Sequence, residues 1–123
     1  MPEKKKVLIV EDEAINAMFL KIMVSKCGYE VTGTAATGDV AIASVEGNSP
    51  DLILMDITLR NSIDGIQVAN ILREKHNFPI IFISGYDDKE TLNRISLISN
   101  TWKLSKPIVE NELTNLIDEV LLN

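Results

Sequence analysis

The chain has 123 residues, 46% of them hydrophobic and 24% charged, which fits one domain, residues 1–123, with a single core. The formal net charge of −6 argues against direct binding to nucleic acid, because that affinity comes mostly from lysine and arginine. No apolar run approaches the roughly 18 residues that span a bilayer, and no signal peptide is recognisable. The single cysteine, Cys27, excludes an internal disulfide and favours a reducing, cytoplasmic setting.

Five short apolar runs have the composition of β-strands. They lie at residues 6–10, 30–35, 51–55, 79–84 and 102–105. Most of these runs are continuously apolar rather than alternating, which is typical of strands that are covered on both faces in a parallel sheet.

Helical periodicity separates the predicted strands. Apolar residues step at three and four positions in five groups: Ile15, Met18, Phe19, Ile22 and Met23; Val40, Ala41 and Val45; Ile66, Ala69, Ile71 and Leu72; Leu92, Ile95 and Ile98; Leu113, Leu116, Ile117, Val120 and Leu121. Gly28 stands where the first helix is expected to end. Strand and helix alternate five times, so we predict an α/β fold with a parallel sheet and helices on both faces.

Polar side chains follow four of the predicted strands at the point where each one ends. Glu11 and Asp12 follow the first strand and Asp56 follows the third. Ser84 ends the fourth strand, and Lys106 follows the fifth. The carboxyl ends of parallel strands share one edge of the sheet, where open α/β sheets bind ligands. We therefore expect these residues to converge on one pocket.

These residue types suit transfer of a phosphoryl group to a carboxylate. Three neighbouring carboxylates repel one another, and Mg²⁺, which prefers oxygen ligands, would relieve that repulsion. A carboxylate can also act as a nucleophile and form an aspartyl phosphate. Mg²⁺, the ammonium group of Lys106 and the hydroxyl group of Ser84 together would stabilise the phosphoryl oxygens. On this interpretation the third strand holds Asp56 rigidly and its end exposes the carboxylate.

Five segments in order resemble the receiver domain of two-component response regulators: "VLIVEDE", "DLILMDITL", "IDGIQVA", "IIFISGY" and "LSKPI". The resemblance covers essentially the whole chain. It implies a flavodoxin-like (βα)5 doubly wound sheet with strand order 2-1-3-4-5. It also implies a signalling switch, not an enzyme that turns over a separate substrate. The phospho-donor would be a phosphohistidine on a sensor histidine kinase or a histidine phosphotransfer protein.

The resemblance assigns roles in acceptance and metal binding by position. Asp56 corresponds to the phosphoacceptor. Asp12 corresponds to a direct Mg²⁺ ligand, and Glu11 to a residue that acts on the metal through water. The main-chain carbonyl of Thr58 corresponds to a further ligand.

The resemblance also assigns the residues that bind and sense the phosphoryl group. Lys106 corresponds to the lysine that pairs with it. Ser84, followed by Gly85, corresponds to the hydroxyl residue that is drawn toward the phosphate. The peptide bond before Pro107 is expected to be cis, a form known mainly from X-Pro bonds.

One position departs from the family pattern. Receivers usually carry Tyr or Phe three residues before the conserved lysine, as a rotating switch aromatic, and here that residue is Lys103, with Trp102 beside it. The segment "PIIFISGY" resembles the P-x-x-F-x-T-G-Y signature of a receiver subfamily that also lacks the aromatic. Two interpretations of Tyr86 follow: it replaces the moving ring, or it is an ordinary surface side chain.

The resemblance places the output surface on the fourth helix, fifth strand and fifth helix. The fourth helix has few apolar anchors, so shifting it would cost little free energy. Trp102, Lys103 and the outer face of the last helix are candidates for contact with an unknown output protein. The chain is expected to be a monomer or a phosphorylation-dependent dimer, and the sequence leaves open whether it acts alone or within a larger protein.

Two alternative functions compete with this interpretation. A degenerate receiver would bind proteins independently of phosphorylation, an idea that the altered position of Lys103 motivates. A phosphatase with an aspartyl nucleophile would need a second carboxylate two residues after Asp56, and Thr58 occupies that place. The sole histidine, His76, is interpreted as a surface residue near a helix end rather than a phosphorelay residue.

Overall fold

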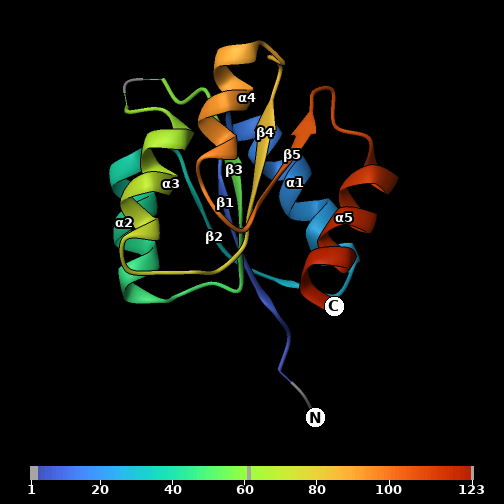
Figure 1. Ribbon diagram of the computed structural model, residues 1–123. Coiled ribbons are helices and arrows are strands. Elements are labelled where there is room, and N and C mark those ends of the chain that lie inside the picture. The colour runs from blue at the N-terminus through green and yellow to red at the C-terminus, as the bar shows by residue number, and fades with distance from the viewer. Residues whose placement is uncertain (1–2, 61, 123) are drawn as a thin grey trace.

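A computed structural model of the chain describes residues 3–60 and 62–122, in which strands and helices alternate (Figure 1). The strands are β1 (Lys6–Val10), β2 (Glu30–Ala35), β3 (Leu52–Asp56), β4 (Ile80–Ser84) and β5 (Thr101–Ser105). The helices are α1 (Ala14–Lys26), α2 (Gly38–Gly47), α3 (Gly65–Arg73), α4 (Lys89–Ser96) and α5 (Glu110–Leu122). Each strand boundary lies within one residue of its predicted position. No described helix is long and apolar enough to cross a membrane.

The five strands form one parallel sheet in the order β2-β1-β3-β4-β5. This is the predicted flavodoxin-like (βα)5 arrangement, and it confirms the expected fold class. The chain runs outward from β1 to β2 and then returns past β1 to β3, so the direction of winding reverses between β1 and β3. Glu11 follows β1 and Asp56 ends β3, which places both carboxylates at this switch point.

Helices cover both faces of the sheet (Figure 1). Side chains of α2, α3 and α4 form one apolar cluster with one face of the strands, and side chains of α1 and α5 form a second cluster with the other face. Alternate residues of a strand point to opposite faces, so β3 contributes Ile53 and Met55 to the first cluster and Leu52 and Leu54 to the second. Every residue of β3 and β4 is buried, as their continuous apolar runs predict.

Helix α1 buries only Met23 of the apolar stripe from which it is predicted. The exposed fractions are 73% for Ile15, 61% for Met18, 63% for Phe19 and 52% for Ile22. The buried residues of the helix are Ala17, Leu20, Met23 and Val24. Apolar residues lie on more than one side of α1, so the periodicity predicts a helix without selecting the face that packs on the sheet.

Particular residues end and start the helices. Gly28 follows α1 with φ of 91°, a left-handed conformation that favours glycine, as the sequence predicts. Asp64 accepts a hydrogen bond from the Gln67 main chain, and the Gln67 side chain accepts one from the Asp64 main chain. This capping box starts α3. Asp88 caps α4 in a similar way by accepting a hydrogen bond from the main-chain N–H of Thr91.

Candidate functional site

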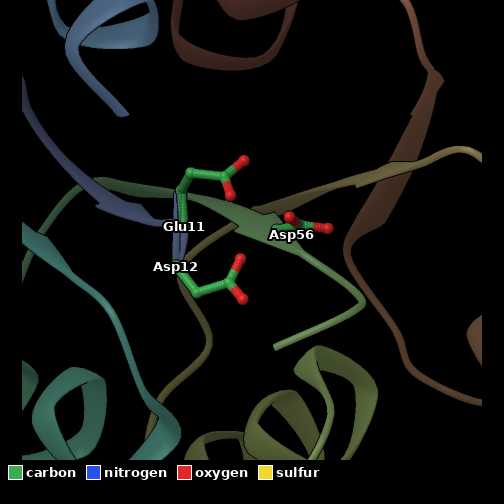
Figure 2. A group of neighbouring side chains, drawn as sticks. All are labelled: Glu11, Asp12 and Asp56. Carbon is green, nitrogen blue, oxygen red and sulfur yellow. The ribbon is translucent and has the colours of Figure 1, made fainter. Parts of the chain in front are cut away.

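Three carboxylates meet at the carboxyl edge of the sheet. Figure 2 shows Glu11, Asp12 and Asp56 grouped at the ends of β1 and β3, and one carboxylate oxygen from each lies within 4.8 Å of the others. Glu11 and Asp56 are both 4% exposed. Negative charges so close together in a buried setting repel one another, and a divalent cation would offset that repulsion. The donors are all hard oxygens, so the group fits Mg²⁺.

Asp56 is held by a main-chain donor and by a cation. Its Oδ1 accepts a hydrogen bond from the main-chain N–H of Thr58 at 3.2 Å. Its Oδ2 lies 3.2 Å from Nζ of Lys106, which follows β5 at the same edge. Both carboxylate oxygens therefore have defined partners, and the ammonium group of Lys106 lies where it can contact a group attached to Asp56.

The main chain at Asp56 is fixed by its neighbours. The N–H of Ile57 donates to the Ile83 carbonyl at 3.1 Å and so extends the ladder between β3 and β4. The N–H of Gly65 donates to the Ile57 carbonyl at 2.7 Å. A Cβ atom at Gly65 would lie 2.3 Å from the main-chain oxygen of Asp56, so only glycine permits α3 to start this close to the site.

Glu11 lies in the least favourable electrostatic setting of the group. Burial raises the pKa of Glu11 to about 7. The neighbouring charge of Asp56 adds to this rise, and a hydrogen bond from the Glu13 main chain opposes it. The ammonium group of Lys106 acts in the opposite direction, with the smallest effect. A carboxyl with this pKa is partly protonated near neutrality, and a bound cation would favour its ionised form.

Arg60 contacts Asp12, a contact that sequence reasoning missed. The Arg60 main-chain N–H donates to Oδ2 of Asp12 at 3.0 Å, and its guanidinium Nε donates to the same oxygen at 3.1 Å. The guanidinium also lies 3.7 Å from a carboxylate oxygen of Glu13. Burial acts to raise the pKa of Asp12, but the donors on Arg60, together with Glu11, lower it below the usual aspartate value.

A signal for Arg60 was present in the sequence. It lies in the segment that follows Asp56, and that segment starts at the same sheet edge as the acidic pair. A basic side chain four residues beyond a carboxylate, in a loop of that edge, is a candidate for pairing with the acidic group. That Arg60 pairs with Asp12 depends on the conformation of this loop, and the loop sequence has no periodic pattern from which to predict it.

Ser84 contacts the loop that follows β4. The side chain is buried, and its hydroxyl oxygen accepts a hydrogen bond from the main-chain N–H of Tyr86 at 2.9 Å. The same hydroxyl donates to the Tyr86 carbonyl at 3.1 Å. The Ser84 carbonyl accepts a hydrogen bond from the Lys106 main-chain N–H at 2.8 Å. Ser84 and Lys106 are therefore tied together at the edge that carries Asp56.

A hollow of about 350 Å³ brings most of the predicted site residues together. It is lined by Asp12, Glu13, Asp56, Thr58, Arg60, Gly85, Tyr86 and Lys106. Glu11 lines a larger and more apolar hollow of about 530 Å³ between α1 and the segment after β5. The larger hollow borders the acidic group only at its Glu11 and Lys106 end, so the smaller one is the candidate site for chemistry.

Tyr86 lines this hollow, whereas Pro107, Lys103 and Trp102 do not. The Lys106–Pro107 peptide bond is cis, as the resemblance implies. The Tyr86 ring is 64% exposed at the rim. Lys103 lies on β5, outside the hollow, where its ammonium group pairs with Asp87. Trp102 is half-buried and packs against the cluster formed with α1 and α5.

Known proteins are similar to this chain in sequence and in fold. The model of the response regulator receiver domain matches residues 7–118. The transcriptional regulatory protein PdtaR of Mycobacterium tuberculosis is 32% identical over 114 residues, which cover 93% of this chain and 55% of PdtaR. The chemotaxis protein CheY of Thermotoga maritima is 42% identical over 82 residues, which cover 65% of this chain and 67% of CheY.

Solved structures agree with these relatives. The signal receiver domain of a modulated diguanylate cyclase from Desulfovibrio desulfuricans G20 has a TM-score of 0.88 and 33% identity, covering 98% of this chain and 95% of that one. The PhyR response regulator receiver domain of Erythrobacter litoralis has a TM-score of 0.85 and 32% identity, covering 97% of this chain and 91% of that one.

The fold and the site together define a doubly wound α/β domain with an acidic group and a lysine-paired aspartate at its switch point. The chain belongs to the response regulator receiver domain family of two-component systems. It spans about half the length of the PdtaR proteins that it matches.

Proposed function

We propose that this receiver domain accepts a phosphoryl group on Asp56 from a phosphohistidine of a histidine kinase or a histidine phosphotransfer protein. The observation that carries the proposal is the setting of Asp56. Its buried carboxylate ends a central strand, faces two further carboxylates and lies 3.2 Å from Nζ of Lys106. A carboxylate placed in this way combines a nucleophile with a counter-charge for the incoming group.

In the transfer step an oxygen of Asp56 forms a bond to phosphorus while the phosphorus–nitrogen bond of the donor histidine breaks. The imidazole leaves with the electron pair of that bond and takes up a proton from solvent water. Lys106, which contacts Oδ2 of Asp56, then also pairs with a phosphoryl oxygen. The Ser84 hydroxyl donates its proton to another phosphoryl oxygen.

The proposed metal is Mg²⁺, held by Asp12, Asp56 and the main-chain carbonyl of Thr58, with Glu11 acting through water. When bound, it supplies positive charge that offsets the charge of the carboxylates and of the transferred group. The guanidinium of Arg60 donates to Oδ2 of Asp12, so it would compete with a cation for that oxygen.

We propose that the domain is a switch and not an enzyme that turns over a separate substrate. A phosphatase with an aspartyl nucleophile needs a general acid or base near it, commonly two residues further on. Thr58 stands at that position and donates its main-chain N–H to Asp56. The domain would take part only in its own phosphorylation and dephosphorylation.

The proposed output is a protein contact made by α4, β5 and α5, in a cytoplasmic setting. The net charge of −6 supports a protein partner over direct contact with nucleic acid. A relative supports a protein partner as the output. PhyR from Bartonella quintana is named an anti-anti-sigma factor, a class that acts on other proteins. It is 28% identical to this chain with a TM-score of 0.81, covering 98% of this chain and 49% of that one.

The proposed phospho-donor protein docks on α1. This helix presents four large, exposed apolar side chains, and Phe19 among them also lines the hollow of about 530 Å³ that reaches Glu11 and Lys106. An exposed apolar stripe beside an acceptor site suits a helical protein surface that brings its phosphohistidine to Asp56.

Intact-mass measurement tests the proposal directly. We expect wild-type protein incubated with acetyl phosphate and Mg²⁺ to gain one alkali-labile phosphoryl group, and Asp56→Asn to gain none. Chelation of Mg²⁺ should abolish the adduct. Absence of any adduct with acetyl phosphate and with phosphorylated histidine kinases would instead favour a degenerate receiver that binds its partner without phosphorylation, the alternative suggested by Lys103 at the usual aromatic position.

A further inference from the structure

Neither the packing of the sheet nor the proposed phosphoryl transfer requires a lysine at position 103 of β5. Lys103 lies on the edge strand β5, and its neighbours Trp102 and Leu104 pack against the cluster on the α1 and α5 side. Side chains alternate along a strand, so Lys103 points to the α4 side of the sheet. Its side chain is only 14% exposed. An ammonium group that is this well shielded from water needs polar partners, because desolvating a charge costs free energy.

Its partners come from two segments that meet at the end of β4. Nζ of Lys103 pairs with the carboxylate of Asp87, in the loop between β4 and α4. It also donates to the Ser105 hydroxyl at 3.0 Å, and that hydroxyl donates to Oδ1 of Asp87 at 3.3 Å. Three polar side chains thus form a closed set of contacts, which we call the β5 latch: Asp87, Lys103 and Ser105.

Two residues of the β5 latch, Ser105 and Asp87, lie next to residues that are proposed to bind the phosphoryl group or that contact them. Ser105 pairs with Ser84 in the register of β4 and β5 and directly precedes Lys106. Asp87 follows Tyr86, whose main-chain N–H and carbonyl are both bonded to the Ser84 hydroxyl. The loop from Gly85 to Asp87 is therefore held at two points, by Ser84 and by the latch.

The Ser84 hydroxyl has a single proton, and in this structure it is donated to the Tyr86 carbonyl. A phosphoryl group on Asp56 that takes this proton leaves the Tyr86 carbonyl without its donor. The loop then loses one of its two hydrogen bonds to Ser84, and the other, from the Tyr86 N–H, lasts only while the Ser84 oxygen stays in place. Asp88, the next residue, caps α4, so a displacement of the loop passes directly to the first turn of that helix.

We propose that the β5 latch replaces the missing switch aromatic: it holds the loop against β5 in the unphosphorylated state and opens when the phosphoryl group draws Ser84 away from Tyr86. This inference rests on the proposed phosphorylation of Asp56. Opening frees the Lys103 ammonium beside Trp102 on β5 and frees the start of α4. Attachments that would persist include the buried Ile95 and the ion pair of Arg94 with Asp64, at 2.8 Å.

Amide hydrogen exchange of residues 85–92 tests the latch, because it reports local opening of this loop and the first turn of α4. Lys103→Met keeps the length of the side chain and removes its charge. We expect it to raise exchange in this segment about threefold in unphosphorylated protein, the size of effect that a partly exposed ion pair supports. Asp87→Asn should act alike and changes only an exposed side chain, so it serves if Lys103→Met does not fold.

The matched control is Lys89→Met. Lys89 is exposed in the first turn of α4 and makes no ion pair within the described part of the chain. Its substitution makes the same charge change beside the same loop and should leave exchange in residues 85–92 as in wild type. Equal effects of Lys89→Met and Lys103→Met would show a general charge effect and overturn the latch.

Phosphorylation separates the latch from the proposed function. Once intact mass shows the adduct, wild-type exchange in residues 85–92 should rise about threefold, and Lys103→Met should show little further rise. An adduct without a change in exchange would overturn the latch and leave the proposed function standing. Absence of an adduct would overturn the proposed function, and with it the opening step.

A second measurement observes the contact itself. The Lys103 hydrogen bond is the largest of the effects that lower the pKa of the Asp87 carboxyl, with Ser105 adding to it and the neighbouring Asp88 opposing it. Carbon-13 NMR should show that pKa rising toward the usual aspartate range in Lys103→Met and in phosphorylated wild type. An Asp87 pKa that is the same in wild type, Lys103→Met and the phosphorylated protein would rule out the latch.

Discussion

At the scale of single residues, two cations contact different carboxylates of the acidic group. Lys106 pairs with Asp56, and Arg60 pairs with Asp12 and Glu13. The two cations differ in setting, because the Lys106 side chain is 33% exposed whereas that of Arg60 is 69% exposed. Exposed ion pairs contribute little free energy, so a divalent cation can displace Arg60 more readily than Lys106.

This difference predicts how Arg60 affects metal binding. We expect Arg60→Gln to bind Mg²⁺ about two- to fivefold more tightly than wild type, because the guanidinium no longer competes for Oδ2 of Asp12. Isothermal titration calorimetry at low ionic strength measures the affinity. Arg94→Gln is the control, since Arg94 pairs with Asp64 instead. Weaker binding by Arg60→Gln would mean that the arginine supports the metal site.

At the scale of elements, one close approach joins α3 to the end of β3. The N–H of Gly65 donates to Ile57, and the α-carbon of Gly65 faces the main-chain oxygen of Asp56. The capping box of Asp64 and Gln67 starts the helix at this point. The position of Asp56 therefore depends on Gly65, at the start of α3, having no side chain.

Alanine substitutions at two glycines test this dependence. We expect Gly65→Ala to lower the free energy of unfolding by roughly 1–3 kcal/mol, because its Cβ would overlap the Asp56 oxygen and force the main chain apart. Gly47→Ala, at the end of α2, has nothing within 4 Å of the new Cβ and should cost less than about 0.5 kcal/mol. Urea denaturation measures both, and similar losses would contradict the overlap argument.

At the scale of the whole molecule, the proposed donor surface on α1 and the α4 part of the proposed output surface lie on opposite faces of the sheet, whereas α5 shares the face of α1. Helix α1, which carries the exposed apolar side chains, packs on one face of the sheet, and α4 packs on the other (Figure 1). The site at the carboxyl edge of the sheet lies between them. A donor protein on α1 can therefore reach Asp56 without covering the β5 latch or α4.

This arrangement predicts a difference between protein and small-molecule donors. We expect Phe19→Ser to slow phosphorylation by a histidine phosphotransfer protein about tenfold, the effect of losing ~1.4 kcal/mol of apolar contact. Phosphorylation by acetyl phosphate should proceed at the wild-type rate, because Phe19 does not line the hollow that contains Asp56. Leu97→Ser, 86% exposed at the end of α4, is the control for loss of a surface apolar residue.

The rate of adduct formation, followed by intact mass, measures both reactions. Equal slowing of Phe19→Ser with both donors would point to damage at the site. A wild-type rate with the protein donor would place its docking surface elsewhere than α1.

The strands and the acidic group show how far local patterns reach. The five runs predict β1 to β5 to within one residue. The central strands β1, β3 and β4 are the clearest, because a strand that is covered on both faces is apolar along its length. Glu11, Asp12 and Asp56 are predicted to converge because parallel strands end at a common edge, and their carboxylates do lie together. The strand order itself comes from family resemblance, since periodicity contains no pairing information.

Tertiary structure alone decided which face of α1 is buried, that Arg60 pairs with Asp12, and that Lys103 pairs with Asp87 and Ser105. Each of these depends on side chains from elements far apart in the chain, whose distances no local pattern contains. The sequence by itself determined the alternation of strands and helices, the burial of β3 and β4, and the gathering of acids at one edge. Those features follow from hydrophobic periodicity and from the geometry shared by all parallel sheets.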